Sequence, residues 1–461
     1  MKRFSPLLRA LLAGLLLAVP AAGATAAATP AKPLNLVILL ADDWRFDTLG
    51  AANNPIVKTP RLDELATRGM RFSHACVTTS ICGVSRASIL TGQWMSRHGN
   101  RAFDSIQTPW NQTLPGILRD NGYFVGHVGK WHCGPFPAEK FDFARAYSGR
   151  FWMKRPDGSD VHVTRRNQED ALEFLVTRPP AKPFFLTVAF SAPHAEDQNP
   201  DQYLPQPESM GLYEEVEIPR PPLATDEALH NLPPFLQQAR NEGRVRFHWR
   251  FDTPEKFQRM MKNYYRLCSE VDATCGRILD ELAATGLLDT TLVVFIGDNG
   301  YYHGDRGLAD KWYPHQESIR VPLIIHDPRI PAAARGTAND SLVLNVDLAP
   351  TLLAAAGLQA PAGMQGRDFA TLYQPGGGRP NWRSEFLYEH STIDTKERIP
   401  SSNAVVRKDV KYVHWPEFAY EELFDLTADP LEQVNLAKNP AHAEQLDMLR
   451  ARLKVLMDEA R

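Results

Sequence analysis

Continuous apolar runs, each followed at once by polar residues, recur along the chain and predict strands that are buried on both faces. These runs cover residues 34–40, 123–128, 184–190 and 292–296. Helical patterns lie between them, over residues 61–69, 114–121 and 255–285. Strands that alternate with helices predict an α/β domain with a large, mixed but mostly parallel sheet flanked by helices.

Polar side chains stand directly after each of these predicted strands. In chain order they are Asp42 and Asp43, Lys130 and His132, His194, and Asp298 and Asn299. Ligands of parallel sheets bind beyond the carboxyl ends of the strands. We therefore expect the active site at this rim of the sheet.

The pattern changes after about residue 366. Short antiparallel strands are predicted over 385–388, 404–407, 411–415 and 422–426. A helix follows from about Ala441, and four leucines form one apolar stripe along it, at 446, 449, 453 and 456. We expect a catalytic domain over residues 29–365 and a smaller C-terminal α+β subdomain over 366–461.

The segment 198–253 is rich in proline and has no clean periodicity, which predicts a long irregular excursion over the sheet rim. Two interpretations stay open, a solvated insertion and a wall of the substrate site. The same holds for its basic cluster, which either binds an acidic sugar or is simply exposed. The cluster consists of Arg244, Arg246, His248, Trp249 and Arg250.

The first 28 residues have the three parts of a secretory signal peptide: basic residues, an apolar run over 10–19, and small alanine-rich residues. The apolar run is short for a membrane span. Cleavage would remove three basic and no acidic residues and take the net charge from −3 to −6, which argues against nucleic-acid binding. We expect a periplasmic or secreted protein without stable membrane insertion.

The chain has 461 residues, 43% of them hydrophobic, and can bury a large core. It contains five cysteines. Cys268 and Cys275 are two helical turns apart, about 10 Å, which is too far for a disulfide. A pairing of Cys76 with Cys133 is possible but has no support. Cys82 stands just ahead of a predicted short amphipathic helix, where the helix N-terminus favours negative charge.

Asp42, Asp43, Asp298 and Asn299 together offer only oxygen ligands. Such a set suits Ca²⁺, or less well Mg²⁺, rather than Zn²⁺. Adjacent carboxylates at a strand end more often are solvated or cap the next helix. Two such ends with Cys82 between them in the chain favour a metal site.

Several spaced motifs resemble those of a known family. The run 81–92, with Cys82, Arg86 and a Thr-Gly pair, resembles the type I sulfatase signature Cys-x-(Pro/Ala)-x-Arg, and departs from it at Val84. Further blocks follow the family order, namely Gly-Lys-Trp-His at 129–132, Ala-Pro-His at 192–194, Asp-Asn-Gly at 298–300, Asp-Lys at 310–311 and Glu-Ser-Ile-Arg-Val-Pro at 317–322. The resemblance extends over residues 34–436.

This resemblance implies an alkaline-phosphatase-like fold and hydrolysis of a sulfate monoester. In the family, a maturation enzyme oxidises the cysteine that matches Cys82 to formylglycine, whose hydrate is the nucleophile. The four oxygen-bearing residues at 42, 43, 298 and 299 match the calcium ligands, and an oxygen of the modified Cys82 completes the set.

The resemblance also implies roles for the remaining polar residues. His132 would assist release of sulfate, His194 and Lys311 would donate to the leaving oxygen, and Arg86 and Lys130 would hold the nucleophile. Lys130, His194 and Lys311 would contact the substrate. The chemistry alone does not distinguish His132 from His194. Nearby polar residues that more plausibly belong to the loop structure are His303, His315, Glu317 and Asp47.

Two other functions stay open. One is a phosphonate monoester hydrolase or phosphodiesterase of the same superfamily. The other is a catalytically silent binding protein in which Val84 prevents conversion of Cys82. Within the sulfatase interpretation, secretion, nine tryptophans and the long rim insertion fit a sulfated carbohydrate, and they fit an aryl sulfate equally well.

Overall fold

The computed structural model describes residues 33–197, 199–374 and 381–461. The predicted signal peptide over residues 1–28 lies outside these ranges. Among the described residues, no helix combines the length and apolar character that crossing a bilayer requires.

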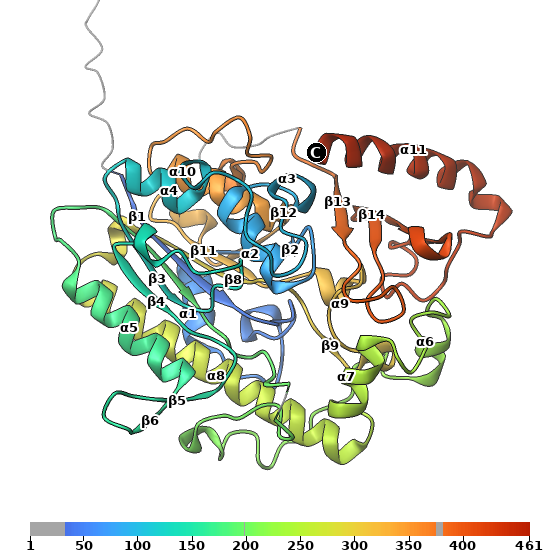
Figure 1. The fold of residues 1–461 in the computed structure, drawn as a ribbon, viewed down its shortest axis with the longest axis horizontal. Helices are drawn as coiled ribbons and strands as arrows, with labels where there is room; N and C mark the ends of the chain where they lie inside the picture. The colour runs from blue at the N-terminus through green and yellow to red at the C-terminus, as the bar shows by residue number, and fades with distance from the viewer. Residues whose placement is uncertain (1–32, 198, 375–380) are drawn as a thin grey trace, which may run out of the picture. The chain divides into compact units, whose positions relative to one another are not determined.

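An eight-stranded sheet forms the centre of the molecule (Figure 1). Its strands, in spatial order, are β12 (Thr337–Leu344), β2 (Met70–Cys76), β11 (Leu323–His326), β8 (Thr291–Gly297), β1 (Asn35–Ala41), β7 (Phe184–Ala189), β3 (Phe124–Gly129) and β4 (Phe143–Ala146). β11 runs antiparallel to both of its neighbours, and the other pairs are parallel. The predicted mixed, mostly parallel sheet is confirmed.

Helices cover both faces of this sheet. One face packs against α2 (Cys82–Thr91), α4 (Leu114–Asp120) and α10 (Leu348–Ala355), and the other against α1 (Pro60–Arg68), α5 (Val163–Thr177) and α8 (Pro254–Ala284). Along β1 successive side chains alternate between these two cores, so the strand is apolar on both faces. Double-sided burial explains why continuous apolar runs marked the central strands.

Helix α2 differs from the sequence-based expectation. An amphipathic helix was predicted after Cys82, but all ten residues of α2 are buried. Its polar side chains therefore face protein rather than solvent. Arg86, for example, reaches the carboxylate of Asp298.

The segment 198–253 is more ordered than its composition predicted. It contains α6 (Asp226–His230) and α7 (Glu242–Arg250). Helix α7 bears four charged residues and one histidine in nine, so an apolar period could not reveal it. Ion pairs with distant residues hold it instead, such as that of Arg250 with Asp310.

Short elements complete the part that precedes the C-terminal sheet. They are α3 (Met95–His98), α9 (Gln316–Ile319), β5 (Trp152–Lys154), β6 (Asp160–His162), β9 (Tyr302–His303) and β10 (Ala309–Asp310). β9 and β10 pair as a small antiparallel ribbon. This ribbon leads directly into Lys311.

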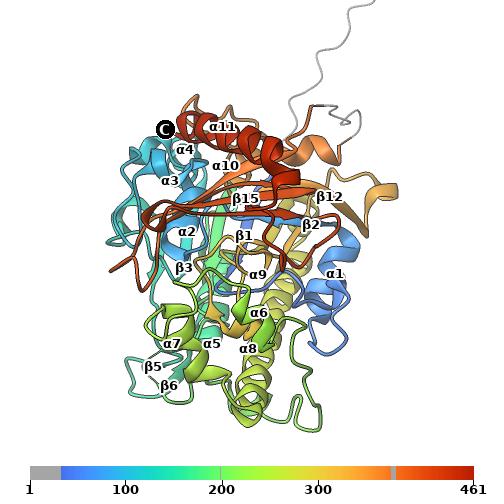
Figure 2. The ribbon, with the colours of Figure 1, turned by 90° about the vertical axis from the view of Figure 1, so that its right-hand side faces the viewer.

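A separate four-stranded antiparallel sheet lies near the C-terminus, and helix α11 runs along it (Figure 2). It consists of β13 (Glu385–His390), β14 (Ser402–Arg407), β15 (Val410–Trp415) and β16 (Tyr420–Asp425), followed by α11 (Ala443–Ala460). Leu387, Val405 and Leu423 face α11, while Tyr388 and Trp415 face the main core. The predicted C-terminal α+β arrangement is confirmed, whereas the boundary at residue 366 stays a prediction.

The five cysteines all carry free thiols and are buried. The possible Cys76–Cys133 disulfide is therefore absent. Cys268 and Cys275 lie on α8 and are unpaired, as their helical spacing predicted.

Candidate active site

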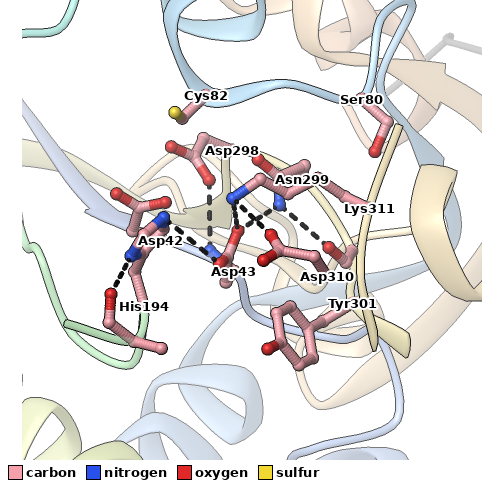
Figure 3. A network of polar contacts seen from close by, with 12 residues as sticks. Asp42, Asp43, Ser80, Cys82, His194, Asp298, Asn299, Tyr301, Asp310 and Lys311 are labelled. Atoms are coloured by element: carbon pink, nitrogen blue, oxygen red, sulfur yellow. Dashed lines mark hydrogen bonds and ion pairs between the residues drawn. The ribbon is translucent and has the colours of Figure 1, made fainter. Parts of the chain in front are cut away.

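The ends of β1 and β8 bring four oxygen-bearing side chains together. The two strands are parallel neighbours with Ala41 opposite Gly297, so the residues that follow them lie side by side. Asn299 Nδ2 donates to Asp43 Oδ1 at 2.7 Å, and the backbone N–H of Asp43 donates to Asp298 Oδ1 at 3.3 Å. Figure 3 shows this network with Asp42 beside it. All four side chains are fully buried.

The neighbouring strands β7 and β3 are followed by basic side chains that reach the same place. The ammonium group of Lys130 contacts Asp42. His194 Nε2 lies 3.7 Å from Asp43 Oδ2, and its other ring nitrogen lies 2.6 Å from the carbonyl oxygen of Ala195. Gly129 makes this approach possible, because its φ is +97° and a Cβ there would lie 2.1 Å from the carbonyl oxygen of Ala189.

Helix α2 begins at this rim. Cys82 is its first residue, and the sulfur lies 3.2 Å from His132 Nδ1. One turn later, Arg86 Nε donates to Asp298 Oδ2 at 2.7 Å and Nη1 donates to the carbonyl oxygen of Lys130 at 2.7 Å. Arg86 thus joins the helix that carries the thiol to both sets of strand-end residues.

Lys311 reaches the site from the ribbon formed by β9 and β10. Its ammonium group contacts Asp43 and lies 3.3 Å from Asp310 Oδ1 (Figure 3). Asp310 is held in turn by Arg250, whose Nη1 lies 2.8 Å from Asp310 Oδ2. The side chain of Arg250 is 0% exposed. For Arg250, both interpretations of the basic cluster at 244–250 are therefore wrong, because this side chain is neither exposed to solvent nor available to a sugar.

Burial shifts the pKa values of the groups nearest Cys82. It raises the pKa of the Cys82 thiol to about 11, so the thiol is neutral at neutral pH. Burial, together with the charge of Lys130, lowers the pKa of His132 to about 2, which leaves a neutral imidazole beside the sulfur. Burial and the charge of Asp42 raise the pKa of Asp298 to about 6.

Asp42 behaves in the opposite way. Burial alone would raise its pKa, but Lys130, His194 and Arg86 outweigh burial and hold the pKa well below its usual range. Asp42 is therefore an anion in a positively charged surrounding. Such a surrounding is suited to a further anion that enters from outside.

The strand-end residues fit a bound cation. Asp42 Oδ1, Asp43 Oδ2 and Asn299 Oδ1 are buried and have no hydrogen-bond partner among the described residues. Ligand atoms of Asp42, Asp43 and His194 lie within 4.8 Å of one another. Unpartnered buried carboxylate oxygens are costly unless a cation satisfies them. Because the donors are mainly oxygen, a hard cation such as Ca²⁺ or Mg²⁺ fits this set.

A cavity of about 330 Å³ opens onto these groups. Its walls include Lys130, His132, Arg150, Ser191, His194 and Glu196. This volume accommodates a ligand of the size of a sugar ring with its substituents. The structure thus brings all the sequence-predicted site residues into one connected group beside a cavity.

The four polar residues expected to be structural have partners of their own. His315 Nδ1 lies 2.6 Å from the hydroxyl of Tyr302, Asp47 pairs with Arg45 at 3.0 Å, Glu317 lies 3.4 Å from Arg306, and the ring of His303 packs edge-on against Tyr264. Sequence reasoning missed Arg150 and Asp310 as parts of the site, and it named Arg250 only as a member of a sugar-binding or exposed cluster. Asp310 stands next to Lys311 in a recognised motif, and no sequence signal distinguishes Arg150.

The comparisons with known proteins agree with this geometry. The fold and its acidic strand ends define a member of the alkaline-phosphatase-like superfamily. The family model described as "Sulfatase" matches residues 34–358, and the model "N-sulphoglucosamine sulphohydrolase, C-terminal" matches residues 304–459. The chain therefore belongs to the sulfatase family, enzymes that act on sulfate esters.

Individual relatives are similar over almost the whole chain. An arylsulfatase of Clostridium perfringens is 28% identical, with 93% of this chain and 94% of the relative covered. An N-acetylglucosamine-6-O-sulfatase of Bacteroides thetaiotaomicron is 25% identical, with 90% and 84% covered.

Two solved structures share the fold. One is a protein in complex with its substrate D-glucosamine-2-N,6-O-disulfate, with a TM-score of 0.78, 23% identity, and 93% of this chain and 98% of that chain covered. The other is the phosphonate monoester hydrolase of Agrobacterium radiobacter, with a TM-score of 0.77, 22% identity, and 93% and 96% covered.

Proposed function

We propose that this sulfatase releases sulfate from a sulfated carbohydrate, with formylglycine derived from Cys82 and with Ca²⁺ held by Asp42, Asp43, Asp298 and Asn299. The observation that carries the proposal is the position of Cys82, at the start of a buried helix and 3.2 Å from His132 Nδ1. A thiol at that place would be a soft nucleophile on sulfur. Formylglycine would instead supply, as its hydrate, a hydroxyl nucleophile.

The chain provides the positive charge that a sulfate ester requires. A sulfate monoester carries negative charge on its oxygens, and this charge grows on the leaving oxygen during cleavage. Lys130, Lys311 and Arg86 converge on the site and can bind and orient these oxygens. Bound Ca²⁺ would add positive charge beside them.

Two histidines are available for proton transfer. His132 is neutral next to residue 82 and can accept a proton there. His194 and Lys311 lie on the other side of the aspartate pair and can donate to the leaving oxygen. An alkoxide leaves poorly without such a donor. The assignment of the two histidines follows the family resemblance, and exchanged roles would be equally consistent with the chemistry.

A carbohydrate substrate is supported by the relatives and by the cavity. The relatives include enzymes named for sulfated sugars, and one structure contains a disulfated glucosamine. The predicted signal peptide would direct the protein to the periplasm or outside the cell, where it would meet such glycans. A maturation enzyme that oxidises Cys82 is the partner that this proposal requires.

Peptide mass spectrometry across Cys82, on protein from its native host, is the decisive experiment. Conversion of the thiol to an aldehyde lowers the mass by about 18 Da. An unmodified Cys82 in an inactive protein would favour the silent binding protein, with Val84 as the departure that blocks conversion. Sulfate release from nitrophenyl sulfate but from no sulfated sugar would contradict the carbohydrate part of the proposal.

A second enzymatic function has one observation in its favour. The phosphonate monoester hydrolase matches the fold with nearly the same TM-score as the disulfated-sugar complex. Turnover of an aryl sulfate should exceed that of an aryl phosphodiester and of a phenyl phosphonate ester. The opposite order would favour the phosphonate monoester hydrolase.

A further inference from the structure

Arg150 differs from the other charged residues that line the cavity. It is exposed, and neither an ion pair nor a hydrogen bond joins its guanidinium group to any described residue. The other basic side chains of the cavity have partners within the protein. Lys130 contacts Asp42, and His194 lies near Asp43. Arg150 is thus the cation of this wall that is available to a ligand.

The acidic residues of the same wall form no ion pair with Arg150. The carboxylate of Glu196 accepts a hydrogen bond from the backbone N–H of Phe151 at 3.0 Å. Asp197 pairs with Arg246 and Arg250 of helix α7. Both carboxylates therefore have other partners, and the guanidinium group at position 150 stays available to a ligand in the cavity.

The backbone that carries Arg150 is anchored on both sides. The N–H of Tyr147 donates to the carbonyl oxygen of Gly129 at 3.1 Å, on strand β3. Phe151 is 3% exposed, its ring stacks on His162, and its carbonyl oxygen accepts from Val163 N–H at 2.7 Å. The anchored backbone holds position 150 at the cavity, so a ligand has to order only the arginine side chain and not the segment.

We propose that Arg150 determines substrate specificity by binding a second anionic group, a sulfate or a carboxylate, on the same sugar whose sulfate ester is cleaved. The inference rests on the proposed function and narrows its substrate class to sulfate esters with a second negative charge. The reacting sulfate lies among Lys130, Lys311 and His194, and these groups are committed to it and to the aspartates. A second anion on the sugar therefore meets Arg150. The guanidinium fork matches the two oxygens of such a group.

The test measures binding, so that it does not depend on turnover. The Cys82→Ala protein, in the presence of Ca²⁺, is titrated with N-acetylglucosamine 6-O-sulfate and with glucosamine 2-N,6-O-disulfate in a calorimeter. The same pair is then titrated with Arg150→Ala and Arg150→Glu added to that background. A third comparison, between a monosulfated glucuronate and the equally sulfated glucose, distinguishes a carboxylate from a sulfate as the second anion. Arg240→Ala is the matched control, because Arg240 is exposed, has no partner among the described residues and lies outside the cavity wall.

The expected result is a ratio of affinities. The Cys82→Ala protein should bind the doubly charged sugar of at least one pair about tenfold more tightly than its singly charged partner. Arg150→Ala should abolish that preference, Arg150→Glu should invert it, and Arg240→Ala should keep it. A preference that survives Arg150→Ala, or the absence of any preference or of measurable binding, overturns the inference.

Failure of the proposed function would look different. In that case unmutated protein with converted Cys82 releases no sulfate from any ester. The binding ratio in the Cys82→Ala background is measured independently of that outcome and still decides the role of Arg150.

Discussion

Substitution of Arg250 by methionine should destabilise the protein and disturb Lys311 at the same time. The guanidinium group is fully buried and donates to Gln202 Oε1 at 2.8 Å and to the hydroxyl of Tyr301 at 2.7 Å. It also pairs with Asp310 at 2.8 Å and with Asp197. Methionine fills a similar volume but offers no donor, so Asp310 would stay buried with Lys311 as its remaining ion-pair partner.

The magnitude follows from the burial of both partners. Removal of one member of a buried ion pair typically costs about 3–5 kcal/mol, because the remaining charge is left uncompensated. Asp310 Oδ1 already lies 3.3 Å from Lys311 Nζ. Without Arg250, Asp310 would attract Lys311 more strongly, and Lys311 would bind the substrate less well. We expect a loss of about 3–5 kcal/mol in the free energy of unfolding and at least a tenfold loss of kcat/KM.

Two assays separate these effects. Urea unfolding measures the stability, and hydrolysis of nitrophenyl sulfate measures the activity of the folded protein. Asp310→Asn in the Arg250→Met background removes the uncompensated charge and should restore part of the stability, about 1–2 kcal/mol. Arg259→Met is the control on helix α8, since Arg259 is exposed and has no partner among the described residues.

The refuting result is clear. If Arg250→Met unfolds within 1 kcal/mol of the wild type, or if Asp310→Asn gives no recovery in its background, the buried pair does not hold this part of the site. A stability loss with unchanged kcat/KM would refute the link from Arg250 through Asp310 to Lys311.

Three further predictions test the fold and the metal site. Burial raises the pKa of Glu422 from 4.5 to about 7, so between these pH values the folded protein keeps a proton that the unfolded chain has lost. In urea unfolding, the wild type should therefore lose up to about 3 kcal/mol of stability relative to Glu422→Gln as the pH rises from about 4.5 to 7. A stability difference that stays constant over this pH range would contradict the assignment. Gly126→Ala should lower the free energy of unfolding by about 1–3 kcal/mol, and with it the unfolding temperature, because the new Cβ would lie 2.4 Å from the ring of Phe174. Gly211→Ala is the control and should be neutral, since the space around its Cβ is open. Equal effects of the two substitutions in calorimetry would refute the packing argument. Chelation of divalent cations should lower the melting temperature. Ca²⁺ at about 100 times its Kd should restore about 2.7 kcal/mol of the free energy of unfolding in the wild type but much less in Asp42→Asn. An identical recovery in both proteins would show that the cation binds elsewhere.

Much of the fold was predictable because strands that are buried on both faces leave a strong apolar pattern in the sequence. The observed β1 and β8 differ from the predicted strands by one residue at each end. The observed α8, Pro254–Ala284, begins and ends one residue before the predicted helix. Both kinds of element bury faces that leave a clear period in the sequence.

Elements held by charges rather than by apolar faces were missed. Helix α7 has no apolar stripe to reveal it, and its residues are fixed by Asp197, Asp310 and Gln202 from other parts of the chain. The burial of α2 was likewise unpredictable, because its polar residues find their partners on distant strand ends. Local sequence cannot show a partner that lies in a distant part of the chain.

The sequence by itself determined which residues end the central strands, because each apolar run stops where its strand leaves the buried sheet. It also determined the family, through motifs that extend from residue 34 to 436. The tertiary structure decided which charged side chains pair with one another and which are left unpaired. Lys130 and Lys311 contact different aspartates, Arg250 is enclosed, and Arg150 has no partner in the part of the chain that the structure describes. The physical reason is that a charged side chain's role depends on its neighbours in space, and those neighbours follow from strand order and loop packing, which residue types alone do not specify.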